Sequence, residues 1–418
     1  MIPFIIWGLI AITILIFFHE LGHLLAAKSS KVEVEKFSIG FGPPILKKRI
    51  KETEYSISLI PLGGYVKMKG EDFEEEGFYT LPLLKKAKVS LAGPLFNLFL
   101  GFLIGILIFS IYGQSIILPV VESKKGSPAY NAGILTGDRI LFVNRDSIED
   151  YSQLLKTLSN NRGREVELIL KRKGRVVKLY WKVPEDSLGI EPLIPPIVGR
   201  VKHSGPADKI GMRRGDEIVS INGKDISSWE DLVKTIRNSS DTLCLGWLRQ
   251  GRYMEAKVLP EIIFDPNEKR KVPQIGVIVY MPKKRFSFIK AVAHSAEWTS
   301  WITIKTFSIL YQIIIGKVSR RALGGPILIA QLSKESISWG MEYFLSLLAI
   351  LSLNLFIINL LPIPVLDGGR FFIFLIERVR GRNFSKREWG TAIQIGWLFI
   401  LLIIFFATFN DILRLLKR

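Results

Sequence analysis

Long apolar segments without charge alternate along this chain with polar segments that carry most of its 57 Lys/Arg and 38 Asp/Glu residues. A helix needs about 20 predominantly apolar residues to cross the hydrocarbon core of a bilayer. Four segments are long enough, the first because its apolar pattern continues beyond its uncharged part. These segments are residues 2–18, 91–113, 343–366 and 389–410. The pattern predicts an α-helical polytopic membrane protein with four transmembrane helices.

A fifth apolar segment, residues 286–316, contains the charged residues Lys290, Glu297 and Lys305. It can cross the membrane, or it can lie along the interface with its tryptophans at the level of the lipid headgroups. The pattern alone leaves both arrangements open. We expect the interfacial arrangement, as part of an amphipathic interfacial segment at residues 286–340. The reason is a candidate metal site, described below, whose ligands meet on one side of the membrane only if this segment does not span.

The polar middle of the chain contains an internal repeat. The segment "SPAYNAGILTGDRILFVNRDSIEDYSQLLKTL" (127–158) aligns with "GPADKIGMRRGDEIVSINGKDISSWEDLVKTI" (205–236) at a constant offset of 78 residues. Each copy has Gly-Asp, a β-branched strand, a turn and an amphipathic helix, a pattern that resembles the PDZ domain. We expect two α+β domains, at 114–192 and 193–285. They can bind peptide ligands by strand addition, or they can only exclude large substrates.

The charge balance and the cysteine content narrow the class of protein. A net charge of +19 is compatible with nucleic acid or with an anionic membrane surface. Because the basic residues lie around apolar segments, we expect the lipid bilayer, and not nucleic acid, as a partner. The single cysteine, Cys244, excludes an internal disulfide framework and a cysteine-based zinc site.

The first apolar segment ends in "FFHELGHLLAAK" (17–28), which places His19, Glu20 and His23 among apolar residues. Polar groups are costly in hydrocarbon, and those found there usually serve a function. Residues i and i+4 share a helix face, so both imidazoles can bind one ion. Glu20 would lie beside that ion, where it can take a proton from water. The pattern predicts a zinc site; the alternative is a chance motif whose histidines bond to neighbouring groups.

A catalytic zinc site of this kind needs a third protein ligand. Asp367 is the best candidate, because it is the only charged residue between Glu342 and Arg370 and it closes an apolar segment. If 286–316 does not span, the third apolar segment crosses in the same direction as the first. Asp367 then reaches the side where the two histidines end the first helix. The alternative is a helix-end aspartate in headgroup water.

Basic residues near the ends of the apolar segments predict the orientation. Loop 24–90 contains 12 Lys/Arg and segment 370–388 contains six, so both are expected on the cytoplasmic side. The repeats would then be extracytoplasmic, and the candidate metal site would open toward the cytoplasm. The basic tail "RLLKR" must lie outside in this arrangement, which argues modestly against it.

These motifs together resemble the site-2 protease family of intramembrane zinc metalloproteases, most closely its bacterial RseP type. The shared features are H-E-x-x-H in a first span, tandem PDZ-like repeats, and N-x-x-P-x-x-x-L-D-G at residues 359–368. The resemblance implies zinc ligation by His19, His23 and Asp367, with Glu20 as general base, in a bacterial cytoplasmic (inner) membrane.

Two asparagines acquire expected roles only from this resemblance. It implies that Asn359 holds or polarises the substrate, and that Asn97, in "AGPLFN" (92–97), faces the substrate from the second span. The alternative for both is hydrogen bonding between helices.

Residues 53–70, "TEYSISLIPLGGYVKMKG", alternate between apolar and polar and then contain Pro61, Gly63 and Gly64. This pattern predicts a β-hairpin. In site-2 proteases a similar element dips into the membrane beside the zinc. An unwound substrate could pair with its edge, so Gly63 and Gly64 are expected substrate contacts. The alternative is a cytoplasmic surface hairpin.

The predicted function is regulated intramembrane proteolysis of single-span membrane proteins. Anti-sigma factors and remnant signal peptides are the substrates that the resemblance suggests. Residues 1–113 and 341–418 would form the N- and C-terminal membrane parts. An inert PDZ-bearing scaffold is an alternative, against which the intact Glu20 argues. A metal transporter is another, but no further intramembrane carboxylates or histidines outline a path.

Overall fold

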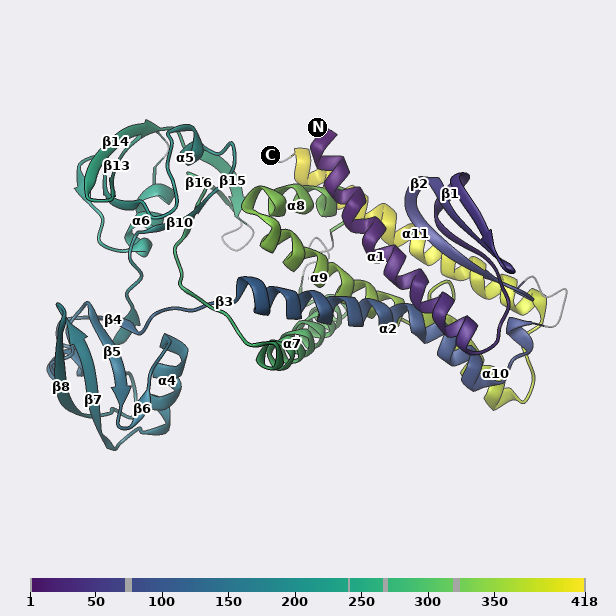
Figure 1. The fold of residues 1–418 in the computed structure, drawn as a ribbon, viewed down its shortest axis with the longest axis horizontal. Coiled ribbons are helices and arrows are strands. Elements are labelled where there is room, and N and C mark those ends of the chain that lie inside the picture. The colour runs from purple at the N-terminus through teal and green to yellow at the C-terminus, as the bar shows by residue number, and fades with distance from the viewer. Residues whose placement is uncertain (1, 72–76, 240, 266–269, 319–323, 417–418) are drawn as a thin grey trace. The chain divides into compact units, whose positions relative to one another are not determined.

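The computed structural model describes residues 2–71, 77–239, 241–265, 270–318 and 324–416. The chain divides into two compact units (Figure 1). One unit combines Met1–Tyr112 with Phe286–Arg418, and the other is Gly113–Arg285. The first contains the apolar helices and the second contains the repeats.

The described part of the first unit contains seven α-helices. They are α1 (Ile2–Ser29), α2 (Leu83–Leu107), α7 (Phe288–Ile314), α8 (Pro326–Trp339), α9 (Met341–Asn359), α10 (Asp367–Arg380) and α11 (Lys386–Leu416). A 3₁₀ turn at Phe78–Thr80 precedes α2, and a π-helical turn at Ile108–Tyr112 follows it.

Four of the helices in the described ranges are long and apolar enough to cross a membrane. They are Ile6–Ser29, Leu83–Tyr112, Met341–Asn359 and Lys386–Leu413. The number agrees with the four predicted spans, and the chain is a multi-pass membrane protein. The third helix ends at Asn359, seven residues earlier than predicted, because Pro362 and Pro364 follow it.

Helices α1, α2 and α9 pack around one apolar cluster, and Figure 1 shows α1 running beside α2. The cluster includes Leu15 of α1, Leu100 of α2 and Leu348 of α9, each 5% exposed or less. Helix α7 packs against α2, where the Ser295 hydroxyl donates to the Phe102 carbonyl over 2.7 Å. This helix is not among the four candidate spans, and its interfacial location stays a prediction.

A β-hairpin follows α1, but it is larger than the predicted hairpin at 53–70. It consists of the antiparallel strands β1 (Val34–Ile50) and β2 (Thr53–Met68). The chain turns at Lys51, whose φ is +55°, and it reverses direction a second time between Ile57 and Gly64, within the range assigned to β2. Phe37 of β1 pairs with residues in both halves of β2, so both halves of β2 flank the start of β1. The reversal predicted at Pro61, Gly63 and Gly64 is therefore present, but its two arms pair with β1 and not with each other.

The second unit repeats one order of elements. The first copy contains β4 (Val120–Ser123), α3 (Pro128–Asn131), β5 (Asp138–Val143), β6 (Asp146–Ser147), α4 (Tyr151–Asn160), β7 (Glu165–Arg172), β8 (Arg175–Lys182) and β9 (Ile190–Pro192). Its sheet has the order β8-β7-β5-β4-β9, with β6 paired to β5. Leu154, Leu168 and Trp181 lie in its buried core.

The second copy contains β10 (Val198–Val201), α5 (Pro206–Lys209), β11 (Glu217–Ile221), β12 (Lys224–Asp225), α6 (Trp229–Arg237), β13 (Leu243–Arg249), β14 (Arg252–Val258), β15 (Glu261–Asp265), β16 (Arg270–Gln274) and β17 (Val277–Val279). Its sheets have the orders β12-β11-β13-β14, β10-β17 and β15-β16. Leu232 and Leu245 are buried where the first copy has Leu154 and Leu168. A short ladder of β3 (Gln114–Ser115) and β18 (Lys283–Lys284) joins the ends of this unit.

Candidate active site

Helix α1 carries His19, Glu20 and His23 in its last three turns. The helix continues to Ser29, so the two histidines lie one turn apart on one face. Their Nε2 atoms are 3.2 Å from each other. The expected convergence of the two imidazoles is therefore present.

Asp367 begins α10 and reaches the same point from the other end of the sequence. Its Oδ2 lies 3.1 Å from His19 Nε2 and 3.4 Å from His23 Nε2. A Cβ on Gly369 would overlap the backbone of Ile363, so glycine is needed where α10 folds back on the segment before it. This close approach sets the position of Asp367.

The backbone of α2 lies directly behind the imidazoles. His23 Nδ1 is 2.8 Å from the Val89 carbonyl oxygen, which can only accept a hydrogen bond. Nδ1 therefore carries the proton, and Nε2 presents its lone pair toward Asp367. A Cβ on Gly93 would overlap the His23 ring, so α2 can come this close only with glycine there.

The three side chains fit a zinc ion. Their ligand atoms lie within 4.8 Å of one another, and the set consists of two imidazole nitrogens and one carboxylate oxygen. Zinc takes such ligands, and three of them leave a coordination position for substrate or water. A metal ion between them would accept the lone pair of His23 Nε2 and balance the charge of the Asp367 carboxylate.

A cavity of about 380 Å³ opens beside this group. Its lining includes His19, Glu20 and His23 of α1, residues Gly64–Met68 of β2, Asn359 of α9, and Asp367 and Arg370 of α10. A Cβ on Gly64 would lie 3.0 Å from Glu20 Cγ, so β2 passes directly beside the glutamate.

The remaining predicted residues lie in different places. Asn359 lines the cavity and so does Gly64, and their substrate-binding roles stay predictions. Gly63 is not among the lining residues, and a Cβ on it would overlap the Phe41 ring. Asn97 is completely buried and its amide contacts the back of the His19 ring. This differs from the expected substrate-facing position, because α2 turns Asn97 toward α1.

Sequence reasoning missed Arg370, which lines the cavity three residues after Asp367. Its guanidinium lies 3.7 Å from the carboxylate of Glu71, another lining residue. Helix periodicity could have found it, because i and i+3 lie on one face of α10.

Comparisons with known proteins connect this geometry to a family. The model of peptidase family M50 matches residues 7–403. The "Regulator of sigma E protease" of Haemophilus influenzae is 32% identical over 445 residues, covering 98% of this chain and 99% of that protein. The "Regulator of sigma-E protease RseP" of Escherichia coli is 32% identical over 442 residues, with 97% and 98% covered.

A further relative and a solved structure also match parts of this chain or all of it. A Vibrio cholerae protein, named for zinc metalloprotease activity, is 31% identical over 454 residues, with 98% of this chain and 99% of that protein covered. Among solved structures, the PDZ domain of an SdrC-like protein from Listeria monocytogenes is 22% identical. It covers 20% of this chain and 84% of that domain, with a TM-score of 0.17.

Proposed function

Since the chain belongs to peptidase family M50 and is an RseP-type zinc metalloprotease of regulated intramembrane proteolysis, we propose that its cavity cleaves single-span membrane proteins. One observation carries this proposal. His19, His23 and Asp367, from segments more than 340 residues apart, converge beside Glu20 in a cavity within the helical unit.

His19, His23 and Asp367 would hold the zinc ion. When bound, zinc in such a site supplies Lewis-acid activation of water and of the peptide carbonyl. Each histidine offers Nε2 and the aspartate offers Oδ2, as their present distances of 3.1–3.4 Å support.

Glu20 would move the proton in this reaction. Its carboxylate lines the cavity next to both histidines, where it can accept a proton from the attacking water. The same carboxyl group can then give the proton to the departing amine nitrogen. Helices α1 and α2 and strand β2 surround this position and limit the access of bulk water.

The substrate would bind in an extended form along β2. A helical segment engages its own peptide groups in hydrogen bonds and must unwind before a peptide carbonyl can reach the site. Gly64–Val66 pair with residues 37–39 of β1 along one edge, and the same three residues line the cavity. An unwound segment could add along the other edge as a further strand. Asn359, which lines the same cavity at the end of α9, would hold the peptide there.

The names of the relatives suggest the class of substrate, and the charge distribution suggests the side of the membrane on which the cavity opens. Because two relatives are named for the regulation of sigma E, anti-sigma-factor-like proteins are proposed substrates, with remnant signal peptides as the second class. The basic loop 24–90 supports a cavity that opens toward the cytoplasm of the bacterial inner membrane. The PDZ-like copies would then inspect or exclude substrates outside.

The test compares the zinc-loaded full chain with its Glu20→Gln variant on a single-span peptide labelled at both ends, in detergent. Only the wild type should cleave. Glu297→Gln is the matched control, because it removes a carboxylate that is 79% exposed on α7 and should cleave like the wild type. Equal cleavage by the Glu20→Gln variant would overturn the role of Glu20. Absence of cleavage by all three would overturn the proposed substrate class.

A further inference from the structure

Asn97 of α2 is completely buried and lies against a metal-ligand histidine. Its side-chain amide is 3.1 Å from Nδ1 of His19, the ring nitrogen that faces away from Asp367. As placed, the amide nitrogen faces the ring, and the amide oxygen Oδ1 has no hydrogen-bond partner among the residues that the structure describes. A buried amide oxygen without a partner is costly, so it needs a reason.

The ring of His19 decides how this amide must be oriented when metal is bound. His19 Nε2 lies 3.1 Å from Asp367 Oδ2 and 3.2 Å from His23 Nε2, so Nε2 is the nitrogen that faces the ion site. A neutral imidazole that binds metal through Nε2 carries its proton on Nδ1. That N–H requires an acceptor, and the NH₂ end of the amide cannot accept.

Rotating the Asn97 amide by half a turn places Oδ1 against His19 Nδ1 with almost no change in shape. One end of the amide lacks a partner in either orientation, so the count of its own hydrogen bonds does not choose between them. The tautomer of His19 decides which orientation the amide takes. His23 shows the same arrangement with a backbone group, because its Nδ1 lies 2.8 Å from the Val89 carbonyl oxygen.

The hydrogen bond between α2 and α9 at this point uses the main chain of Asn97 and not its side chain. The backbone carbonyl of Asn97 accepts a 2.7 Å hydrogen bond from the Ser352 hydroxyl, which joins α2 to α9 at this point. The main chain therefore supplies the contact between helices, and the side-chain amide is directed at His19.

We propose that Asn97 is a positioning residue that acts through His19. Its Oδ1 accepts the Nδ1–H of His19 and so fixes the tautomer and ring orientation in which Nε2 binds the metal. Partners behind metal-bound histidines increase metal affinity in this way. This inference rests on the proposed metal site.

The test measures the zinc dissociation constant of the full chain in detergent, after removal of metal, by competition with a chromogenic chelator. Asn97→Leu should bind zinc about 10–100-fold more weakly than the wild type. Asn97→Asp should bind at least as tightly as the wild type, because a carboxylate can only accept. Asn354→Leu is the matched control with unchanged affinity, since Asn354 bonds Thr306 on α7 and does not line the cavity.

The Asn97→Asp variant keeps the inference falsifiable if Asn97→Leu does not fold. If residue 97 did not accept the His19 Nδ1–H, the carboxylate of Asn97→Asp would be buried without a donor, and this variant would bind zinc more weakly than the wild type. That result would overturn the inference, and so would unchanged affinity in Asn97→Leu. A wild type without zinc affinity would instead overturn the metal site on which the proposed function depends.

Discussion

Both units of this protein contain buried carboxylates, but the cations that pair with these carboxylates differ in how far they are buried. In the helical unit Lys86 of α2 and Glu377 of α10 form a 2.8 Å ion pair in which both side chains are 5% exposed. In each PDZ-like copy an aspartate that is 1% exposed pairs with an arginine that is 25–28% exposed. The two residues of the first pair are 291 positions apart on two helices. The others join neighbouring strands of one sheet, with Asp216 directly before its strand.

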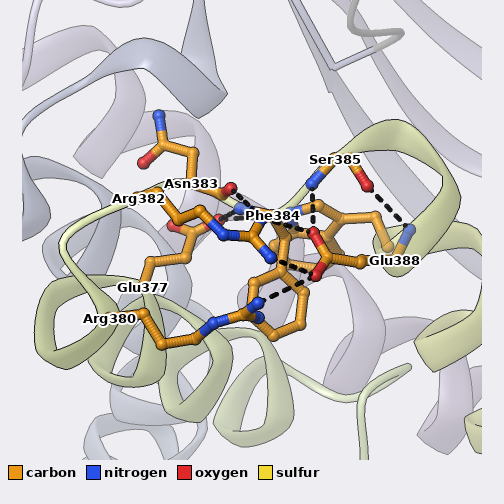
Figure 2. A network of polar contacts seen from close by, with 8 residues as sticks. Glu377, Arg380, Arg382, Asn383, Phe384, Ser385 and Glu388 are labelled. Carbon is orange, nitrogen blue, oxygen red and sulfur yellow. Dashed lines mark hydrogen bonds and ion pairs between the residues drawn. The ribbon is translucent and has the colours of Figure 1, made fainter.

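This difference indicates what each pair stabilises. Glu377 also accepts hydrogen bonds from the Phe384 amide over 2.9 Å and from the Trp389 indole over 3.4 Å, at the turn between α10 and α11 (Figure 2). The Lys86–Glu377 pair therefore holds α10, whose first residue is Asp367, against α2. The pairs in the repeats hold only the copy in which they lie.

Removing the Lys86 ammonium should have the largest effect on stability. Lys86→Met would leave the Glu377 carboxylate buried without its cation, which costs about 3–5 kcal/mol of unfolding free energy. Zinc affinity should fall with it, because α10 carries Asp367. Chemical unfolding in detergent and zinc titration measure the two effects.

The control is the double variant Lys86→Met/Glu377→Gln. Glutamine removes the buried charge and keeps an acceptor for the Phe384 amide, so most of the stability should return. If the single variant loses no more than about 1 kcal/mol, the pair behaves as a solvent-exposed one, and the contrast between the units disappears.

The aspartates of the repeats should have a smaller and strictly local effect. Arg172 binds Asp138 through two hydrogen bonds of 2.8 and 2.6 Å, and these bonds raise the pKa of the Arg172 guanidinium. Asp138→Asn should cost about 1.5–3 kcal/mol in the first copy, the range for hydrogen bonds to charged groups. Hydrogen exchange of the full chain should detect it there alone, with unchanged zinc affinity.

Asp216→Asn is the matched variant in the second copy, because Arg249 binds Asp216 through two bonds of 2.7 Å. Its loss of protection should be confined to that copy. A loss in both copies from either substitution would show that the two domains unfold as one.

The same contrast explains how much of the molecule could be predicted from its sequence. The repeat was visible because both copies keep Gly-Asp at an offset of 78 residues. The spans follow from length and composition. His19 and His23 follow from helix periodicity, and Asp367 from being an isolated charge in an apolar region.

Contacts between distant segments could not be predicted in this way. Lys86 reads as one of several exposed lysines in "LLKKAK" (83–88), and only the packing of α10 on α2 buries it beside Glu377. The orientation of Asn97 depends on which face α2 turns toward α1. The partner of β2 depends on the long-range register with β1, which alternation within 53–70 does not contain.

Glu388 should show the smallest effect, although it lies at the same turn as Glu377 (Figure 2). Its carboxylate is 32% exposed, and it pairs with Arg380 over 3.0 Å and with Arg382 over 2.9 Å. It also accepts the Ser385 amide over 2.8 Å while its own amide donates to the Ser385 hydroxyl over 3.2 Å, which forms a capping box.

Glu388→Gln should therefore keep the cap and lose only exposed ion pairs, at a cost of about 0.2–1 kcal/mol of unfolding free energy. Glu388→Ala loses the reciprocal bond as well and should be the less stable of the two variants. Added salt should reduce the difference between wild type and Glu388→Gln, because it screens exposed charges, and should change the Lys86→Met loss much less. Chemical unfolding at two ionic strengths measures this directly. Equal salt dependence for both sites would show that burial does not separate the two glutamates, and that the Lys86–Glu377 pair is open to solvent.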